Sequence, residues 1–531
     1  MANKGKGAVE NTEIRTHIFN LWRKWYKKPT PKVHIHHHKR KDSQVTTPAK
    51  APRGNLKNSH LSMMALGSAI GAGFFLGTGV AISQAGPAVL ISYAIAALIA
   101  ISVMYCLAEL ASALPSSGSF STYAQAGIGR WAGFTVGWLY WFMLIMVLGL
   151  EITGAATIFI GWFPQVPQWV IALAIVVVLG GVNLRTAGEF GTIEAWLAGI
   201  KVAAIAVFLL VGLGLVVNII PGRTLSLSHN LLGEGGFAPA GVGGIVLGLL
   251  AVVTSFGGIE IVTIAAAEAE DAKAAMGAAI RQVVWRIMVF YIGTVTLLVL
   301  LLPWNSAEMK NNPLAAVLNM AGVPAVGLIM EIIVFIALVS SFSANVYASS
   351  RLAYSLSARN MGSTWLLGKK TSAQKGQSEQ NIQNEQVNQE TSTILTQEEE
   401  LTGDMTYGRT PKRAVWICIL LSLVSVALNW YVPDQLLGIL LNAIGLILLV
   451  AWLFIVISQI RLHHKLEKLG IIAIRTPLWP WLSWAALAGV LAVFVLLATT
   501  ASGRGNLVVI ATMTLIAVIT FKIRERVVGK V

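Results

Sequence analysis

Charged residues are scarce in this 531-residue chain. Asp, Glu, Lys and Arg make up 12% of it, whereas 55% of residues are hydrophobic and the mean hydropathy is +0.70. A soluble protein carries about 25% charged residues to cover its surface. Apolar stretches of about 20 residues recur along the chain, each long enough to cross ~30 Å of hydrocarbon. The composition therefore predicts an all-α polytopic membrane protein.

Cysteines and the signatures of enzymes are also scarce. The two cysteines, Cys106 and Cys418, lie within apolar stretches, which is typical of small buried side chains rather than of disulfides or metal ligands. The sequence contains no HExxH motif, no nucleophile elbow and no Walker motif. We therefore predict no enzymatic activity, no metal centre and no bound cofactor.

The net charge of +15 is concentrated at the N-terminus. Residues 1–60 hold 14 of the 39 Lys and Arg residues and three acidic residues, so this tail alone carries +11. We predict a disordered cytoplasmic tail and no nucleic-acid partner. Residues 22–28 interleave aromatic and basic side chains, so this segment either rests on anionic lipid headgroups or is simply solvated.

The apolar stretches predict a transporter domain over residues 61–531 with twelve transmembrane helices. The expected spans are 63–84, 88–113, 131–160, 167–184, 192–220, 240–266, 284–303, 323–356, 413–431, 434–461, 478–499 and 505–523. With both termini in the cytoplasm, 35 of the 39 Lys and Arg residues fall on the cytoplasmic side, and only Arg223, Lys310 and Arg504 fall outside. This bias follows the positive-inside rule. Residues 371–403 are rich in Gln, Glu, Ser and Thr, which predicts a disordered cytoplasmic loop.

Two glycine-rich segments interrupt the first and sixth spans. They are Gly67–Phe75 (GSAIGAGFF) and Thr254–Glu260 (TSFGGIE). Glycine clusters let backbone leave the helix, and freed backbone groups inside a bilayer are tolerated only where they line protein or a cavity. Breaks five spans apart are expected of an inverted repeat of five plus five helices. Close helix packing through small residues is the alternative explanation.

An amino acid zwitterion suits two such breaks. Half-helix N-termini offer N–H groups to a carboxylate, for which we nominate the amides of Gly71 to Gly73, and unwound carbonyls offer acceptors to an ammonium group. The predicted substrate site comprises both breaks and one polar residue of the eighth span: Ala69, Ile70, Gly71, Ala72, Gly73, Thr254, Ser255, Phe256, Gly257 and Asn345.

Several motifs carry a resemblance to a known family. They are AIGAGFFLGTG (69–79), AELASALPSSGSFSTYA (108–124), GWLYWF (137–142), EFGTIEAWLAGIKVAAI (189–205), FGGIEIVTIAAAEAED (256–271), YASSRLAYSL (347–356), RTPKRAV (409–415) and ISQIRLHHK (457–465). From about residue 55 to 465 the chain resembles the amino acid permeases of the amino acid–polyamine–organocation superfamily, in particular the branch with γ-aminobutyrate permeases.

The resemblance implies a LeuT-type fold, with repeat one at about 63–220, repeat two at about 240–461 and two extra helices within 478–523. Two positions depart from the family pattern. Relatives often carry an aromatic gate where this chain has Thr254, and an NSG triplet where it has Ser343, Ala344 and Asn345.

Ionisable residues within spans are costly and indicate a function. We predict proton coupling through Lys201, Glu260 and Glu151. In some proton-coupled members of the family a lysine at the position of Lys201 resembles a substitute for sodium, and burial disfavours the charged form of a lysine, which favours proton release. A permanently charged Lys201 that braces the first span is the alternative.

Acidic residues at the inner end of span six suggest a gate. Glu268, Glu270 and Asp271 are candidate partners of Arg281 or Arg286, with a solvated surface cluster as the alternative. Together these features predict a multi-pass protein of the cytoplasmic membrane that imports small or medium neutral amino acids by proton symport, its partners being the substrate, protons and the bilayer. An amino acid exchanger and a transporter-like sensor remain open alternatives.

Overall fold

The computed structural model describes residues 70–114, 119–185, 190–220, 227–233, 235–258, 260, 272–322, 325–367 and 411–528. All of them belong to one compact unit, residues 55–531, and their regular structure is helical throughout. The N-terminal tail and the 371–403 segment lie outside the described residues.

Nine segments of the described chain are long and apolar enough to cross a membrane. They are Ala72–Ala113, Arg130–Trp162, Trp196–Val216, Ile280–Leu301, Val326–Ala358, Lys412–Tyr431, Gln435–Lys468, Trp481–Thr499 and Ala501–Val527. Two shorter apolar helices cover Gln168–Leu184 and Gly241–Ser255. Helix is present within each of the twelve predicted ranges, while the number of crossings and the inverted repeat remain predictions.

Ala72–Ala113, the first of these nine segments, consists of two helical parts joined by a turn. As one continuous helix its 42 residues would extend about 60 Å, twice the ~30 Å of hydrocarbon. Helices α3 (Ala72–Phe75) and α4 (Gly77–Ala85) lead into the turn η1 (Gly86–Ala88), and α5 (Val89–Ala113) follows. Gly86 has φ +64°, and Thr78 Oγ1 lies 2.9 Å from Tyr93 OH. This contact between residues 15 apart shows that α5 folds back beside α4.

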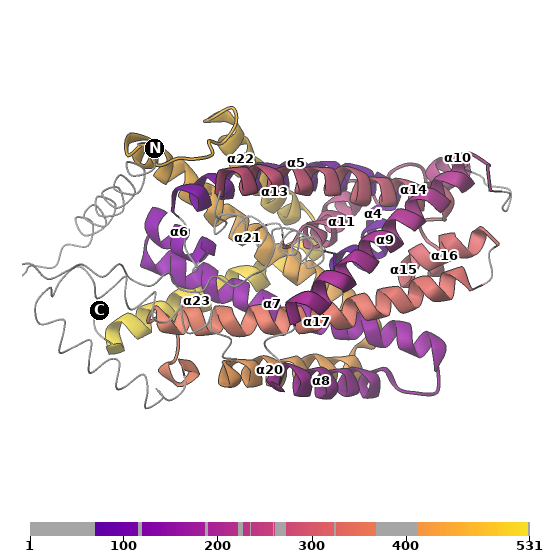
Figure 1. Ribbon diagram of the computed structural model, residues 1–531. Coiled ribbons are helices and arrows are strands. Elements are labelled where there is room, and N and C mark those ends of the chain that lie inside the picture. Colours follow the sequence, from indigo (N-terminus) through magenta and orange to yellow (C-terminus); the bar gives the residue numbers. More distant parts are fainter. Residues whose placement is uncertain are drawn as a thin grey trace, which may run out of the picture. The chain divides into compact units, whose positions relative to one another are not determined.

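The central helix is α7 (Arg130–Trp162), which packs against α17 (Val326–Ala358) and α21 (Pro433–Lys468). Figure 1 shows α7 and α17 side by side and, beside them, α8 (Gln168–Arg185) paired with α20 (Lys412–Tyr431). Helix α11 (Gly241–Ser255) packs on α4, α5 and α21. These contacts place the two predicted breaks, at the start of α3 and the end of α11, against each other and next to α7.

The remaining elements flank this centre. They are α6 (Ser119–Gly127), α9 (Phe190–Val216), α10 (Leu227–Leu232), α13 (Ala272–Arg286), the π-helix η2 (Ile287–Ile292), α14 (Gly293–Leu301), α15 (Ala307–Asn311), α16 (Pro313–Met320), η3 (Thr364–Leu367), α22 (Trp481–Thr499) and α23 (Ala501–Val528).

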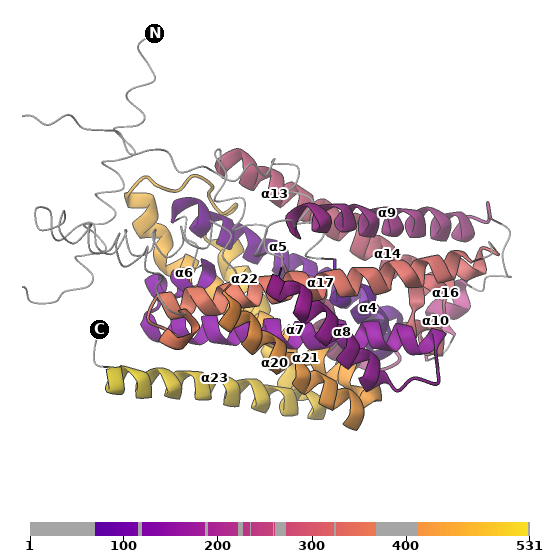
Figure 2. The same ribbon diagram turned by 60° about the horizontal axis from the view of Figure 1, so that its bottom comes forward.

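Burial differs sharply between the central and peripheral helices. In the most apolar 18-residue window of α7, 72% of residues are buried, against 6% in that of α23. Figure 2 shows α23 running along the outside of the other helices. Because an apolar helix that is not buried in its own protein must be covered by lipid or by another chain, α23 is in contact with the bilayer or with a partner.

Candidate substrate and coupling site

The first helix break lies at the N-terminus of α3. Gly71 has extended backbone (φ −128°, ψ −155°), and its carbonyl accepts hydrogen bonds from Phe74 N and Phe75 N. Helix α3 then lasts four residues before Leu76 separates it from α4. The break predicted from the glycines is therefore a short helical turn preceded by extended backbone.

The second break follows α11, which ends at Ser255. The bonds Phe256 N to Val253 O (3.0 Å) and Gly257 N to Thr254 O (3.1 Å) tighten the last turn to an i→i+3 pattern. Gly258 then adopts φ +94°, a conformation that favours glycine. The sixth predicted span therefore stops being a regular helix at the predicted place.

The two breaks touch through backbone. Ser255 Oγ donates a hydrogen bond to Gly73 O over 2.5 Å. A Cβ atom added to Gly73 would lie 2.8 Å from the carbonyl oxygen of Thr254, closer than real Cβ contacts. A glycine at position 73 is therefore required for the two breaks to approach this closely.

Aromatic rings cover one side of the paired breaks. Tyr291 stacks on Phe74 at 5.0 Å between ring centroids and lies 5.3 Å from Phe256. Phe256 also faces Tyr93 at 6.2 Å. Tyr291 belongs to the π-helix η2, and single π-helical turns occur frequently at functional sites. The rings give the junction an apolar wall from which water is excluded.

Polar side chains from three helices meet beside the first break. Lys201 Nζ on α9 donates to Ser341 Oγ on α17 over 3.0 Å. One turn further along α17, Asn345 Nδ2 donates to both carboxylate oxygens of Glu151 on α7, at 3.2 and 3.4 Å, and to Ser341 O at 3.0 Å. A Cβ atom on Gly71 would lie 3.1 Å from Glu151 Oε1 and 3.5 Å from Ser341 Oγ.

This group, which we call the α17 cluster, consists of Lys201, Glu151, Ser341 and Asn345. Lys201 and Glu151 are 1% and 2% exposed. Burying an ammonium and a carboxylate is expensive unless both are held by polar partners. The cluster supplies such partners and brings two ionisable groups to the backbone of the first break.

Glu260 has a separate environment at the second break. Tyr140 OH donates to Glu260 Oε1 over 2.5 Å, and Gly258 N donates to the same oxygen over 3.1 Å. The guanidinium of Arg286, the last residue of α13, is near enough to act on Glu260 electrostatically and is itself 2% exposed. Within the part of the chain that the structure describes, its three nitrogens have no hydrogen-bond partner.

The other predicted site residues are placed as follows. Ile70 and Ala72 are buried beside Gly71. Thr254 Oγ1 donates to Leu441 O over 2.8 Å, so its hydroxyl ties α11 to α21. Arg281 is exposed. Ala69 and Glu268 lie outside the described residues, and the proposed Glu268–Arg281 gate stays a prediction.

A second buried polar cluster joins the end of α5 to α21. Glu109 Oε1 accepts from Gln459 Nε2 (2.8 Å) and lies 2.7 Å from His463 Nδ1, while Glu109 Oε2 accepts from Thr476 N (2.7 Å). His463 stacks on Trp479 at 3.7 Å. These bonds hold the segment between α21 and α22 against α5, so this carboxylate has a structural role.

Some residues at the site are not singled out by sequence reasoning. Ser341 stands four residues before the predicted Asn345 and therefore shares its helix face. Tyr140 lies in the GWLYWF segment and is likewise not predicted as a site residue. Only the polar character of these residues within apolar surroundings distinguishes them in the sequence.

Paired helix breaks with buried ionisable groups define a class of protein, the membrane carriers that bind substrate at helix interruptions. Comparison with known proteins identifies the family. A family model described as amino acid permease matches residues 60–372 and 402–526. The chain belongs to the amino acid permease family, a family of transporters rather than enzymes.

Several characterised relatives resemble most of the chain. An aromatic amino acid transport protein of Corynebacterium glutamicum is 42% identical over 432 residues, covering 80% of this chain and 85% of that protein. A γ-aminobutyric acid permease of Bacillus subtilis is 36% identical over 468 residues, covering 88% and 92%. An L-asparagine permease of Salmonella typhimurium is 33% identical over 484 residues, covering 88% and 89%.

Proposed function

We propose that this chain imports small or medium neutral amino acids across the cytoplasmic membrane by proton symport. It does so with twelve transmembrane helices, ten of them forming an inverted repeat of five plus five, and with both termini in the cytoplasm. The observation that carries the proposal is the α17 cluster, because it joins Lys201 and Glu151 to the backbone of the first helix break.

The substrate class follows from the chemistry of the two breaks. The amides at the start of α3 suit a carboxylate, and the carbonyls near Thr254 and Gly257 suit an ammonium group. The relatives named for aromatic amino acids, γ-aminobutyrate and asparagine share ligands with one carboxylate and one ammonium group. A neutral zwitterion offers its carboxylate to the amides and its ammonium group to the carbonyls.

The coupling mechanism uses the bond from Lys201 to Ser341. A protonated Lys201 donates to Ser341 Oγ and supplies positive charge beside the first break, where extended backbone and Glu151 present oxygen atoms. Loss of this proton to the cytoplasm leaves Glu151 without the positive charge of Lys201, which shifts the helices toward another conformation. The substrate carboxylate, bound at the same break, then stabilises the protonated state.

The decisive experiment measures uptake of a panel of radiolabelled amino acids into proteoliposomes in sodium-free buffer with an imposed inward proton gradient. We expect the unmutated protein to accumulate a neutral amino acid. Lys201→Ala should lose gradient-driven accumulation. Lys201→Arg keeps a permanent charge and should be inactive or limited to exchange, since arginine does not deprotonate in proteins.

The alternatives predict other outcomes. An exchanger requires internal amino acid and ignores the proton gradient, and a sensor binds amino acid without moving it. A strict sodium requirement would refute proton coupling. Accumulation that persists in Lys201→Ala would remove this lysine from the mechanism and leave Glu151 or Glu260 as the coupling residue.

A further inference from the structure

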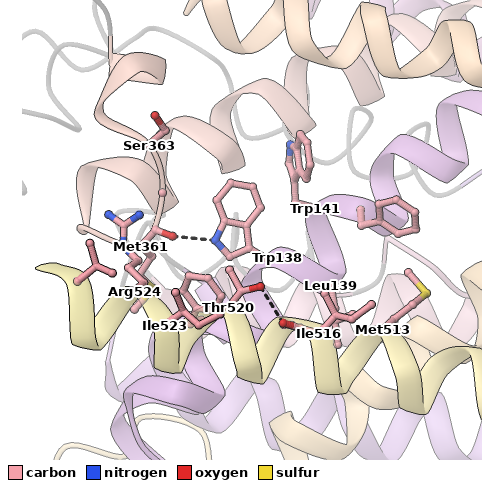
Figure 3. Close-up of a pocket in the computed structure, with 15 residues that line it drawn as sticks. Trp138, Leu139, Trp141, Met361, Ser363, Met513, Ile516, Thr520, Ile523 and Arg524 are labelled. Carbon is pink, nitrogen blue, oxygen red and sulfur yellow. Dashed lines mark hydrogen bonds between the residues drawn. The ribbon is translucent and has the colours of Figure 1, made fainter.

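A groove of about 760 Å³ lies between α7, residues 361–363 and α23, away from the helix breaks. Its walls are almost entirely apolar, with side chains from both helices facing each other across it (Figure 3). The principal contributors are Phe134, Trp138, Phe142, Met513, Ile516 and Ile523.

The α7 wall is ordered by aromatic contacts. Trp138 Nε1 donates to Met361 O over 2.8 Å, and its ring meets that of Trp141 edge-on at 5.2 Å (Figure 3). Phe134 lies 6.4 Å from Trp138 and 5.6 Å from Phe521 of α23. These contacts hold the aromatic side chains of this wall in place.

Among the described residues, one basic side chain, that of Arg524, lines the groove near the end of α23. Its Nε donates to Asn360 O over 3.2 Å, which holds the guanidinium at this place. No ion pair involves Arg524 within the described part of the chain, where the ion pairs are centred on Glu109 and Glu467. The groove is therefore apolar along its length and cationic at one end.

The groove faces the bilayer. Helix α23 is almost unburied in the protein, and its neighbours Lys522 and Arg526 are exposed at the same end. Under the proposed topology this end lies at the cytoplasmic surface, where α7 begins and α17 ends. Anionic lipids concentrate in the cytoplasmic leaflet and attract basic residues at this depth.

We propose that the groove binds an anionic phospholipid, with its acyl chains between α7 and α23 and its phosphate against Arg524. A second copy of the chain is a poorer occupant, because copies inserted in the same orientation would bring Lys522, Arg524 and Arg526 of each copy together at one level, with Glu525 offsetting only one of the three charges. The basic N-terminal tail is disfavoured by the same repulsion. An amphiphile with one anionic end matches both the apolar walls and the charge.

The test measures lipid binding to the purified full-length protein by native mass spectrometry, with phosphatidylglycerol and phosphatidylcholine as probes. Arg524→Gln should weaken binding of phosphatidylglycerol about fivefold, the effect of one basic residue at an anionic surface, and leave phosphatidylcholine unchanged. Arg526→Gln is the matched control, because it removes the same charge from an exposed position that does not line the groove.

A second pair of variants tests the apolar part. Ala517→Phe places a ring in the groove and should abolish the tightest phosphatidylglycerol binding, whereas Ala511→Phe adds the same ring at an exposed position of α23 outside the groove. Unchanged binding in both Arg524→Gln and Ala517→Phe overturns the proposal. Loss of a dimer in both variants, measured by light scattering, also overturns it in favour of a second copy. If both Arg524→Gln and Ala517→Phe still bind amino acid, the change in lipid binding does not reflect a failure of the proposed transport function.

Discussion

The contact between Gly73 and Thr254 offers the sharpest test of the paired breaks. In Gly73→Ala the new Cβ would lie 2.8 Å from the Thr254 carbonyl oxygen and 3.1 Å from its carbon, both backbone atoms. Ordinary contact begins at 3.4 Å, so α3 and α11 would have to move apart by about 0.6 Å. Rotation of a side chain cannot relieve this contact, because the atoms that the new Cβ meets belong to the backbone.

The expected cost follows from overpacking of a closely packed junction, roughly 1–3 kcal/mol. A destabilisation of that size changes a conformational equilibrium by about 5- to 150-fold. If transport passes through the state in which the breaks touch, Gly73→Ala should lower the initial uptake rate by at least about fivefold. The hydrogen bond from Ser255 Oγ to Gly73 O would lengthen with the same movement.

The assay compares initial uptake rates in proteoliposomes with thermal unfolding of the purified protein. Gly438→Ala on α21 is the matched control, since nothing lies within 4 Å of a Cβ added there. Replacing a glycine inside a helix by alanine gains about 0.5–1 kcal/mol, so this control should be at least as stable as the parent. If Gly73→Ala is folded and its initial uptake rate is within twofold of that of Gly438→Ala, the two breaks do not approach each other as closely as described.

Three further predictions concern topology, the breaks and the C-terminal end of α5. A cysteine near Lys310 should react with a membrane-impermeant maleimide added to intact cells, whereas a cysteine at position 385 should not. Gly71→Val and Gly257→Val should abolish uptake while the proteins still insert, because a branched side chain would occupy space beside Glu151 in the first case and Thr254 O in the second. Glu109→Ala should destabilise the protein by ~3–5 kcal/mol, since Gln459 Nε2, Thr476 N and His463 Nδ1 all lose their buried partner.

Each of these measurements has a contrary outcome. Labelling at position 385 from outside would overturn the proposed span count. Near-normal amino acid binding by either valine variant would place the substrate elsewhere. For Glu109→Ala the matched control is Glu467→Ala, because the Glu467 side chain is 43% exposed and its ion pairs contribute only ~0–1 kcal/mol. Equal unfolding temperatures for Glu109→Ala and Glu467→Ala would contradict a structural role for Glu109.

The sequence alone determines the helical membrane class and the family of this protein. Apolar stretches of membrane-spanning length and the positive charge bias are local, additive features that need no knowledge of neighbours. The break in the sixth span is equally local, because glycine weakens a helix wherever it stands, and α11 ends at Ser255 beside Gly257 and Gly258 as the glycines predict. The presence of buried ionisable residues is also evident without coordinates.

Partnerships between distant residues are decided only by the tertiary structure. Glu109 has partners among the described residues, Gln459 and His463, that lie more than 300 positions away in the sequence. Likewise, Lys201 and Ser341 are 140 residues apart, and Glu151 and Asn345 are 194 apart. A helix that is apolar on every side carries no pattern to say which face meets which neighbour. The packing of nearly equivalent apolar faces selects these pairs, and small residues such as Gly73 decide where two backbones come into close contact.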